Sequence, residues 1–196
     1  MILVPGKLLF VHIQKTGGTS ITKLIIENFG DWQVIGRKHS RMSFTKLKRD
    51  ELFSFTFVRN PWDRMVSWYN MIINGSMRIP WHIYVRREGR TFEEFVCKCI
   101  TSGRADRTGI FQLRKIVDNQ GSILVDFVGR FERFTDDVLE VFSRMEVSIN
   151  RSDIPHLLRN GHGHYSKYYN SDTQKIVGKV FGDEIEFFGY QFEGMG

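Results

Sequence analysis

A short stretch near the start of the chain combines the residue types that hold a phosphate group. It reads Gln14-Lys15-Thr16-Gly17-Gly18-Thr19-Ser20. The two glycines let the backbone approach a ligand closely and turn its N–H groups inward. Three hydroxyl groups and the positive charge of Lys15 add further donors. In nucleoside-triphosphate-binding loops, G-x-x-x-x-G-K-S/T, the lysine follows the glycines. The stretch therefore predicts a phosphate loop of another type, or else a tight turn with a surface lysine.

A second motif joins a strand-like run to a helix-like run through an arginine. It reads Phe57-Val58-Arg59-Asn60-Pro61-Trp62-Asp63-Arg64-Met65-Val66-Ser67-Trp68-Tyr69. An arginine at the carboxyl end of a buried strand points into the ligand crevice of an α/β fold, where its guanidinium can bind phosphate through two hydrogen bonds. Arg64 is expected to pair with Asp63 or to pack on the outside of the helix.

The patterns around both motifs predict the strands and helices that must position them. Apolar runs typical of buried strands occupy residues 8–13, 52–58 and 122–128. Apolar positions at helical spacing and capping residues predict helices over residues 21–29, 61–73, 92–100, 136–145 and 171–188. Strand, glycine-rich turn and helix in this order open an α/β nucleotide-binding fold. The length predicts a single domain over residues 1–196.

Both motifs resemble those of a known family. Residues 10–20 resemble the 5′-phosphosulfate-binding loop of the sulfotransferases that use 3′-phosphoadenosine 5′-phosphosulfate (PAPS), in particular the carbohydrate group that includes the heparan 2-O- and chondroitin/HNK-1-type enzymes and their bacterial relatives. Gln14 stands where that family commonly has proline, which should alter loop rigidity and leave the chemistry unchanged. Family members hold the 3′-phosphate with an arginine and a serine eight residues on, here Arg59 and Ser67. Residues 123–132 and 185–190 resemble two further family segments.

The resemblance implies a P-loop-like three-layer α/β fold with a mainly parallel central sheet flanked by helices. It also implies transfer of a sulfuryl group from PAPS to an acceptor hydroxyl, with adenosine 3′,5′-bisphosphate as product and no metal requirement. Lys15 would both bind the donor and stabilise the leaving phosphate. The remaining residues expected to bind the donor are Thr16, Gly17, Gly18, Thr19, Ser20, Arg59, Ser67 and, in a late polar loop, Tyr165, Ser166 and Lys167.

The acceptor hydroxyl needs a base, and histidine is the usual choice near neutral pH. His39 is the predicted base, because the family carries a histidine in the segment that leads to the second motif. Glu132 is the alternative base. His12 lies in a predicted strand and is interpreted as a core histidine. His82 is either a core residue or an acceptor contact.

The last three histidines fall in a glycine-rich stretch between residues 150 and 170. Their spacing fits no standard zinc site, so we expect the loop Gly161-His162-Gly163-His164-Tyr165-Ser166-Lys167 to fold over the nucleotide instead. These residues are His156, His162 and His164.

Charge and composition limit the kinds of partner that the chain is expected to bind. The chain has a net charge of +6, and six Lys or Arg residues without any acid lie between Asp31 and Asp50. A basic surface favours anionic partners. We expect an anionic or neutral glycan, or another hydroxyl acceptor, and no nucleic acid. The rival hypotheses are a small-molecule kinase, for which Asp126 is a weak magnesium-ligand candidate, and a basic module that binds glycan or nucleic acid without catalysis.

The sequence also bears on the cellular setting. Cys97 and Cys99 are the only cysteines, and two residues apart on a helix they would point in different directions, so no disulfide framework is expected. No apolar run approaches the ~20 residues of a membrane span. We therefore expect a cytoplasmic protein, or the soluble catalytic domain of a larger anchored enzyme. The oligomeric state is not indicated.

Overall fold

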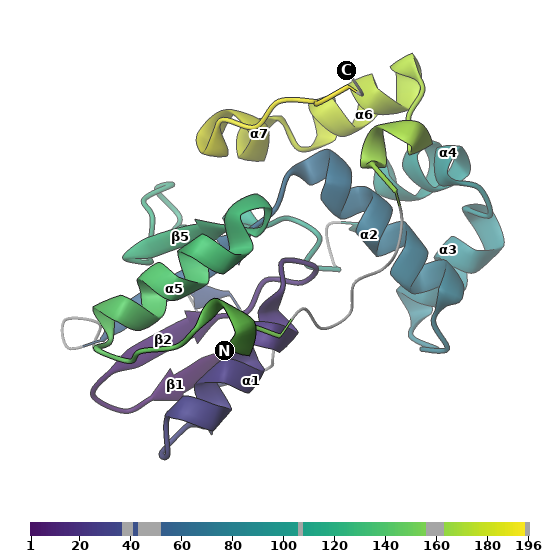
Figure 1. Ribbon diagram of the computed structural model, residues 1–196. Coiled ribbons are helices and arrows are strands. Elements are labelled where there is room, and N and C mark those ends of the chain that lie inside the picture. The colour runs from purple at the N-terminus through teal and green to yellow at the C-terminus, as the bar shows by residue number, and fades with distance from the viewer. Residues whose placement is uncertain (37–40, 43–51, 106–107, 156–162, 195–196) are drawn as a thin grey trace. The chain divides into compact units, whose positions relative to one another are not determined.

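The computed structural model describes residues 1–36, 41–42, 52–105, 108–155 and 163–194 (Figure 1). The chain divides into two compact units. The sheet unit consists of Met1–Arg59 and Gln112–Arg159, and the helical unit consists of Asn60–Phe111 and Asn160–Gly196. Each unit is described by itself.

Five described strands build the sheet unit, in the order β3-β1-β2-β4-β5. Strands β2, β4 and β5 are parallel, whereas β1 is antiparallel to both β2 and β3. The predicted α/β fold with a central sheet flanked by helices is thereby confirmed, with an antiparallel pair added at one edge. The strands are β1 (Ile2–Val4), β2 (Leu8–Val11), β3 (Gln33–Val34), β4 (Phe53–Val58) and β5 (Phe127–Arg130).

Two helices, α1 (Gly18–Asn28) and α5 (Phe134–Arg144), cover one face of this sheet (Figure 1). Alternate residues of a strand point to opposite faces, so Phe10, Phe55 and Phe57 all join the apolar core beneath these helices. On the other face of β2, Leu9 and Val11 are also fully buried. The short helices of this unit are η4 (Leu113–Lys115), η5 (Phe131–Arg133) and η6 (Arg151–Asp153).

The helical unit packs around a core rich in aromatic side chains. Trp62, Trp68, Phe92, Phe95 and Phe181 are all buried in one cluster. Burying large aromatic surfaces supplies the main apolar stabilisation in such a bundle. Its elements are α2 (Pro61–Asn74), α3 (Pro80–Glu88), α4 (Phe92–Glu94), η2 (Phe95–Ile100), η7 (Tyr165–Tyr168), α6 (Ser171–Val180) and α7 (Gly182–Phe188).

The strands β1 and β3 and the helix α3 had no counterpart in the sequence predictions, and three predicted elements differ in the structure. The long C-terminal helix is interrupted at Phe181, where the buried ring and the poor helix propensity of Gly182 separate α6 from α7. The helix over residues 92–100 changes from an α-helical turn to the π-helical segment η2. The third strand is shifted to Phe127–Arg130, because Ile123 instead forms an isolated bridge with Val117. Within the described residues, the helices are too short or too polar to cross a membrane.

Candidate functional site

The predicted phosphate loop connects β2 directly to the first turn of α1. Lys15 and Gly17 both have positive φ angles, 67° and 83°, with Thr16 between them. Such reversals along the backbone turn successive N–H groups to one side and create a concavity for anions. The first turn of any α-helix presents N–H groups that the helix itself does not fully satisfy, and the helix dipole is positive at the start of α1. The loop therefore has the backbone geometry of an anion site, which the residue types alone could only suggest.

The two glycines are required by contacts as well as by conformation. A Cβ atom on Gly17 would lie 2.4 Å from Cε2 of Phe134. A Cβ atom on Gly18 would lie 2.2 Å from Cδ2 of His12, whose ring stacks on Phe10 at 5.6 Å between ring centres. His12 is 5% exposed. Its interpretation as a core histidine fits this position, and its ring fixes where α1 begins.

The hydroxyl groups of the loop differ in their surroundings. Thr16 is fully buried, and its hydroxyl donates to the carbonyl oxygen of Ile13 at 2.9 Å. This bond closes the loop onto the end of β2, so the hydroxyl hydrogen of Thr16 is directed into the loop. Ser20 is also buried, whereas Thr19 is half-buried at the helix start.

Arg59 follows β4 and reaches the phosphate loop. One guanidinium nitrogen, Nη1, donates to the carbonyl oxygen of Lys15 at 3.4 Å. The backbone of Arg59 is held on both sides by the amide of Gln112, which accepts from the Arg59 N–H and donates to the Arg59 carbonyl, each at 2.9 Å. The guanidinium carbon lies 4.1 Å from the centre of the Phe131 ring. The predicted phosphate-binding arginine thus lies beside the predicted phosphate loop.

The sheet register explains this proximity. Val11 pairs with Thr56 and Val58 pairs with Arg130, so β2, β4 and β5 all end at the same edge of the parallel sheet. Ligands of open α/β sheets bind at this carboxyl edge. The loop, Arg59 and the turn that contains Glu132 each follow one of these three strand ends.

Asp126 lies at the other end of the parallel strands, where the strands begin. Its carboxylate accepts hydrogen bonds from the backbone N–H and the hydroxyl of Ser54, at 2.7 and 2.6 Å. Ser54 lies at the amino end of β4, about 16 Å along the strand from Arg59. Asp126 therefore ties two strand starts together at the edge away from Lys15, and the kinase hypothesis loses its magnesium-ligand candidate.

The helical unit carries the second half of the arginine motif. Ser67 is buried in α2. Arg64 is fully buried, and its Nη1 donates to the carbonyl oxygen of Ile110. The expected outward position of Arg64 is therefore wrong, because the helix turns this position into the core, where a backbone carbonyl accepts from the guanidinium. Asn60 accepts from the Trp62 N–H at 3.0 Å, which caps α2.

The late polar loop also lies in the helical unit. Tyr165 is buried, its hydroxyl accepts from the backbone N–H of Glu193 at 2.6 Å, and burial raises its pKa. Ser166 bonds to Nδ1 of His164 at 2.8 Å. Lys167 is exposed. Tyr165 and Ser166 are therefore engaged in local structure, and donor contacts by these two residues and Lys167 remain predictions.

Comparison with models of protein families matches residues 5–191 to the sulfotransferase family. The chain belongs to this sulfotransferase family. The match includes both phosphate motifs and extends through both units, and the carbohydrate type that the motifs resemble is consistent with it. Comparison with curated proteins and with solved structures gave no match.

Only some histidines of this sulfotransferase lie within the residues that the structure describes. The predicted base His39, together with His156 and His162, lies outside the described residues. His82 is 3% exposed, and burial, followed by the charge of Arg86, lowers its pKa. His82 is thus a buried histidine in the core of the helical unit. Among the described residues, no group of three or more His, Cys, Asp or Glu side chains could hold a metal ion.

Sequence reasoning missed three residues that shape the candidate site. Gln112 clamps the Arg59 backbone, Phe131 lies under the guanidinium, and Phe134 contacts Gly17. Only the resemblance of residues 123–132 to a family segment pointed to this part of the chain. A glutamine 53 positions away in sequence gives no local signal that it will contact Arg59.

Proposed function

We propose that this sulfotransferase transfers the sulfuryl group of PAPS to an acceptor hydroxyl at the carboxyl edge of β2, β4 and β5. The observation that carries the proposal is the contact between the Arg59 guanidinium and the Lys15 carbonyl oxygen, 3.4 Å apart, beside the N-terminus of α1. PAPS carries a 5′-phosphosulfate and a 3′-phosphate, and the two motifs supply one anion site for each.

The loop residues would receive the 5′-phosphosulfate. Backbone N–H groups of Gly17, Gly18 and Thr19 at the start of α1 favour a bound anion. Thr16 would contribute through its backbone, because its hydroxyl donates to Ile13. Lys15 adds the full positive charge, and Ser20 completes the motif that the family resemblance assigns to this site.

Arg59 would receive the 3′-phosphate. Its guanidinium can make two parallel hydrogen bonds to a phosphate, and the Gln112 amide holds its backbone in place. The family resemblance adds Ser67 to this role. ATP lacks a 3′-phosphate, so Arg59 would distinguish the PAPS nucleotide from ATP.

The chemical step needs a base and stabilisation of the leaving group. The acceptor oxygen attacks sulfur in line, the bond from sulfur to the bridging oxygen breaks, and its electron pair remains on the leaving adenosine 3′,5′-bisphosphate. Lys15 would stabilise that developing charge. His39 would take the acceptor proton, with Glu132 at the same sheet edge as the alternative base.

The proposed acceptor is a sugar hydroxyl on an anionic or neutral glycan. The carbohydrate-type motifs and the net charge of +6 support this assignment. Transfer from radiolabelled PAPS to a panel of glycans, lipids and small alcohols would identify the acceptor. Transfer to lipids or small alcohols alone would exclude the glycan assignment.

Nucleotide binding tests the donor assignment directly. Isothermal titration calorimetry should show tighter binding of adenosine 3′,5′-bisphosphate than of ATP with magnesium. Arg59→Ala should remove most of this preference, whereas Lys23→Ala, which changes an exposed lysine on α1, should not. Preference of the wild-type protein for ATP would exclude the proposed donor.

The base is tested separately by turnover. His39→Ala should abolish transfer while the affinity for adenosine 3′,5′-bisphosphate stays close to the wild-type value. A large loss of nucleotide affinity instead would make His39 a binding residue, and Glu132→Gln would then be the next variant to measure.

A further inference from the structure

The turn η5, which follows β5, places an aromatic ring under the guanidinium of Arg59. Phe131 is partly buried, and its ring centre lies 4.1 Å from the guanidinium carbon. A cation over an aromatic face is attracted by the ring quadrupole, more strongly where water is excluded. Arg59 is only 7% exposed. Phe131 therefore restricts the positions that the guanidinium can adopt.

A buried carboxylate fixes the turn that carries Phe131. Oδ2 of Asp137 accepts from the backbone N–H of Arg130 at 2.6 Å, and Oδ1 pairs with Nη2 of Arg133 at 3.1 Å. Phe131 lies between these two residues in the chain, so Asp137 holds the turn on both sides of it. Asp137 is 5% exposed and belongs to the first turn of α5, where the helix dipole favours an anion.

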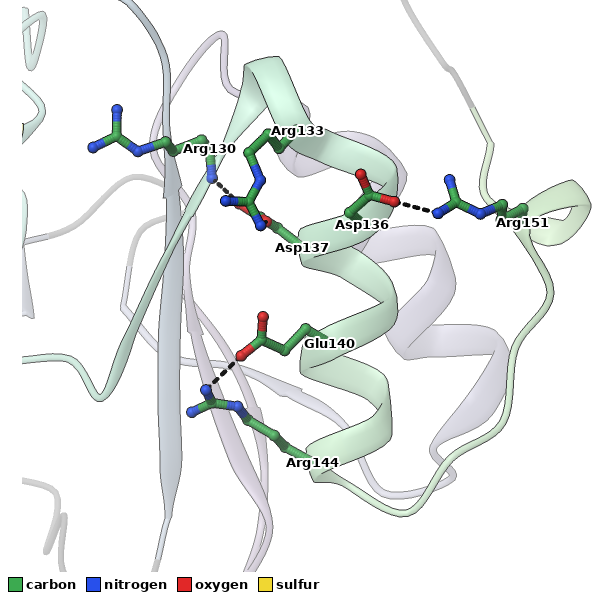
Figure 2. A network of polar contacts seen from close by, with 7 residues as sticks. All are labelled: Arg130, Arg133, Asp136, Asp137, Glu140, Arg144 and Arg151. Atoms are coloured by element: carbon green, nitrogen blue, oxygen red, sulfur yellow. Dashed lines mark hydrogen bonds and ion pairs between the residues drawn. The ribbon is translucent and has the colours of Figure 1, made fainter.

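The adjacent residue Asp136 differs from Asp137 in its burial and in its partner. Figure 2 shows Asp136 directed away from the turn, towards Arg151, while Asp137 faces Arg130 and Arg133. The side chain of Asp136 is 53% exposed. Two adjacent carboxylates in one helical turn thus differ in burial and in partner, and only Asp137 contacts the turn.

The residue that follows this turn, Phe134 at the start of α5, contacts the phosphate loop. The rings of Phe131 and Phe134 are 5.9 Å apart between centres, and the Phe134 ring fills the space beside Gly17. One aromatic pair therefore touches Arg59 on one side and the loop on the other. Both anion sites of the sheet unit are held against the same short segment.

We propose that Phe131 is the positioning residue of Arg59, and that Asp137 acts through Phe131 by fixing η5. Together they set the guanidinium at a fixed place relative to the phosphate loop. The enzyme thereby selects nucleotides that carry a phosphate at the 3′ as well as the 5′ position. This inference rests on the proposed function, in which Arg59 binds the 3′-phosphate.

The test compares two nucleotides that differ only in the 3′-phosphate. Calorimetry gives the dissociation constants of adenosine 5′-monophosphate and adenosine 3′,5′-bisphosphate, and their ratio measures the contribution of the 3′-phosphate. Phe131→Leu should lower the ratio roughly three- to ten-fold, the size expected of a lost cation–π contact. Phe131→Tyr keeps the aromatic face and should preserve the ratio.

Variants of the adjacent residues Asp137 and Asp136 form a matched pair. Asp137→Ala should lower the ratio to a similar extent as Phe131→Leu, and Asp137→Asn, which retains an acceptor for the Arg130 N–H, should lower it less. Asp136→Asn should leave the ratio unchanged. If Asp137→Ala does not fold, Phe131→Leu and Asp137→Asn decide the question.

The outcomes separate this inference from the proposed function. If the wild-type protein has no preference for the bisphosphate, the proposed function fails, and this inference fails with it. If Arg59→Ala loses the preference but Phe131→Leu keeps it, the function stands and the positioning role of Phe131 is refuted. If Asp136→Asn lowers the ratio as much as Asp137→Asn, the role of Asp137 is refuted.

Discussion

The imidazole ring of His12 occupies the space that any side chain at Gly18 would need. A Cβ atom on Gly18 would lie 2.2 Å from Cδ2 and 2.3 Å from Nε2 of His12. Both residues are buried, one at the end of β2 and the other at the start of α1. The junction of strand and helix therefore depends on this pair, independently of the chemistry of the loop.

Gly18→Ala should destabilise the protein by about 1–3 kcal/mol, the usual cost of overpacking a well-packed site. Urea denaturation would measure the free energy of unfolding. Gly30→Ala is the control, because a Cβ atom there meets nothing within 4 Å. The double variant His12→Ala/Gly18→Ala should recover part of the loss, since the smaller side chain frees the space. Wild-type stability of Gly18→Ala would contradict the contact.

Lys15 combines the positive charge proposed to act in transfer with a strained backbone. Lys15→Ala and Lys15→Gly should both lower the transfer rate by about 10²–10³-fold, the loss typical of removing one group that stabilises transition-state charge. Their stabilities should differ: with φ at 67°, glycine should be more stable than alanine by about 1 kcal/mol. A transfer assay and urea denaturation separate the two effects. Normal transfer by Lys15→Gly would remove Lys15 from the mechanism.

Asn60 should be structural in the helical unit. Its side-chain oxygen caps α2, and its amide nitrogen donates to the carbonyl oxygen of Gln191 at 2.9 Å. Asn60→Ala should cost about 1–2 kcal/mol of stability through the lost cap. Asn60→Asp keeps the cap acceptor but loses the donor, so it should retain most of the stability while hydrogen exchange near Gln191 becomes faster. Equal losses for both variants would show that the cap contributes little.

The two cysteines should react differently. Burial raises the pKa of Cys99 to about 11, whereas Cys97 is exposed with a pKa that burial raises less. Iodoacetamide at pH 8 should therefore label Cys97 and leave Cys99 unmodified until the protein unfolds. Peptide mass spectrometry would identify the labelled residue, and Cys97→Ser should prevent labelling of the folded protein. Labelling of Cys99 in the folded variant would show that this thiol is accessible.

The raised pKa of Cys99 also predicts that the folded protein loses stability at alkaline pH. The pKa of Cys99 is higher in the folded state than its ordinary value of 9.0, so unfolding releases a proton above that pH. The stabilising contribution is complete below pH 9 and is lost as pH rises towards 11. Cys99→Ala should flatten the dependence of unfolding free energy on pH in this range.

Much of the fold and of the site followed from local patterns. The glycine-rich turn between an apolar run and a helical repeat located β2, the loop and α1. The arginine motif likewise located the end of β4 and the start of α2 at Pro61. These signals are local, because strand and helix periodicity and turn conformation depend on residues near one another in sequence. The family resemblance rested mainly on the same two motifs.

Packing decided what those patterns left open. The parallel order of β2, β4 and β5 brings Arg59 to the Lys15 carbonyl and sends Asp126 to the far edge of the sheet. Arg64 turns inward to a carbonyl, against the expectation from its charge. Such contacts join residues that are distant in sequence, so no local pattern encodes them. The sequence by itself determined which residues could bind phosphate, and the tertiary structure alone placed Phe131 under the Arg59 guanidinium and Asp137 against the turn that carries Phe131.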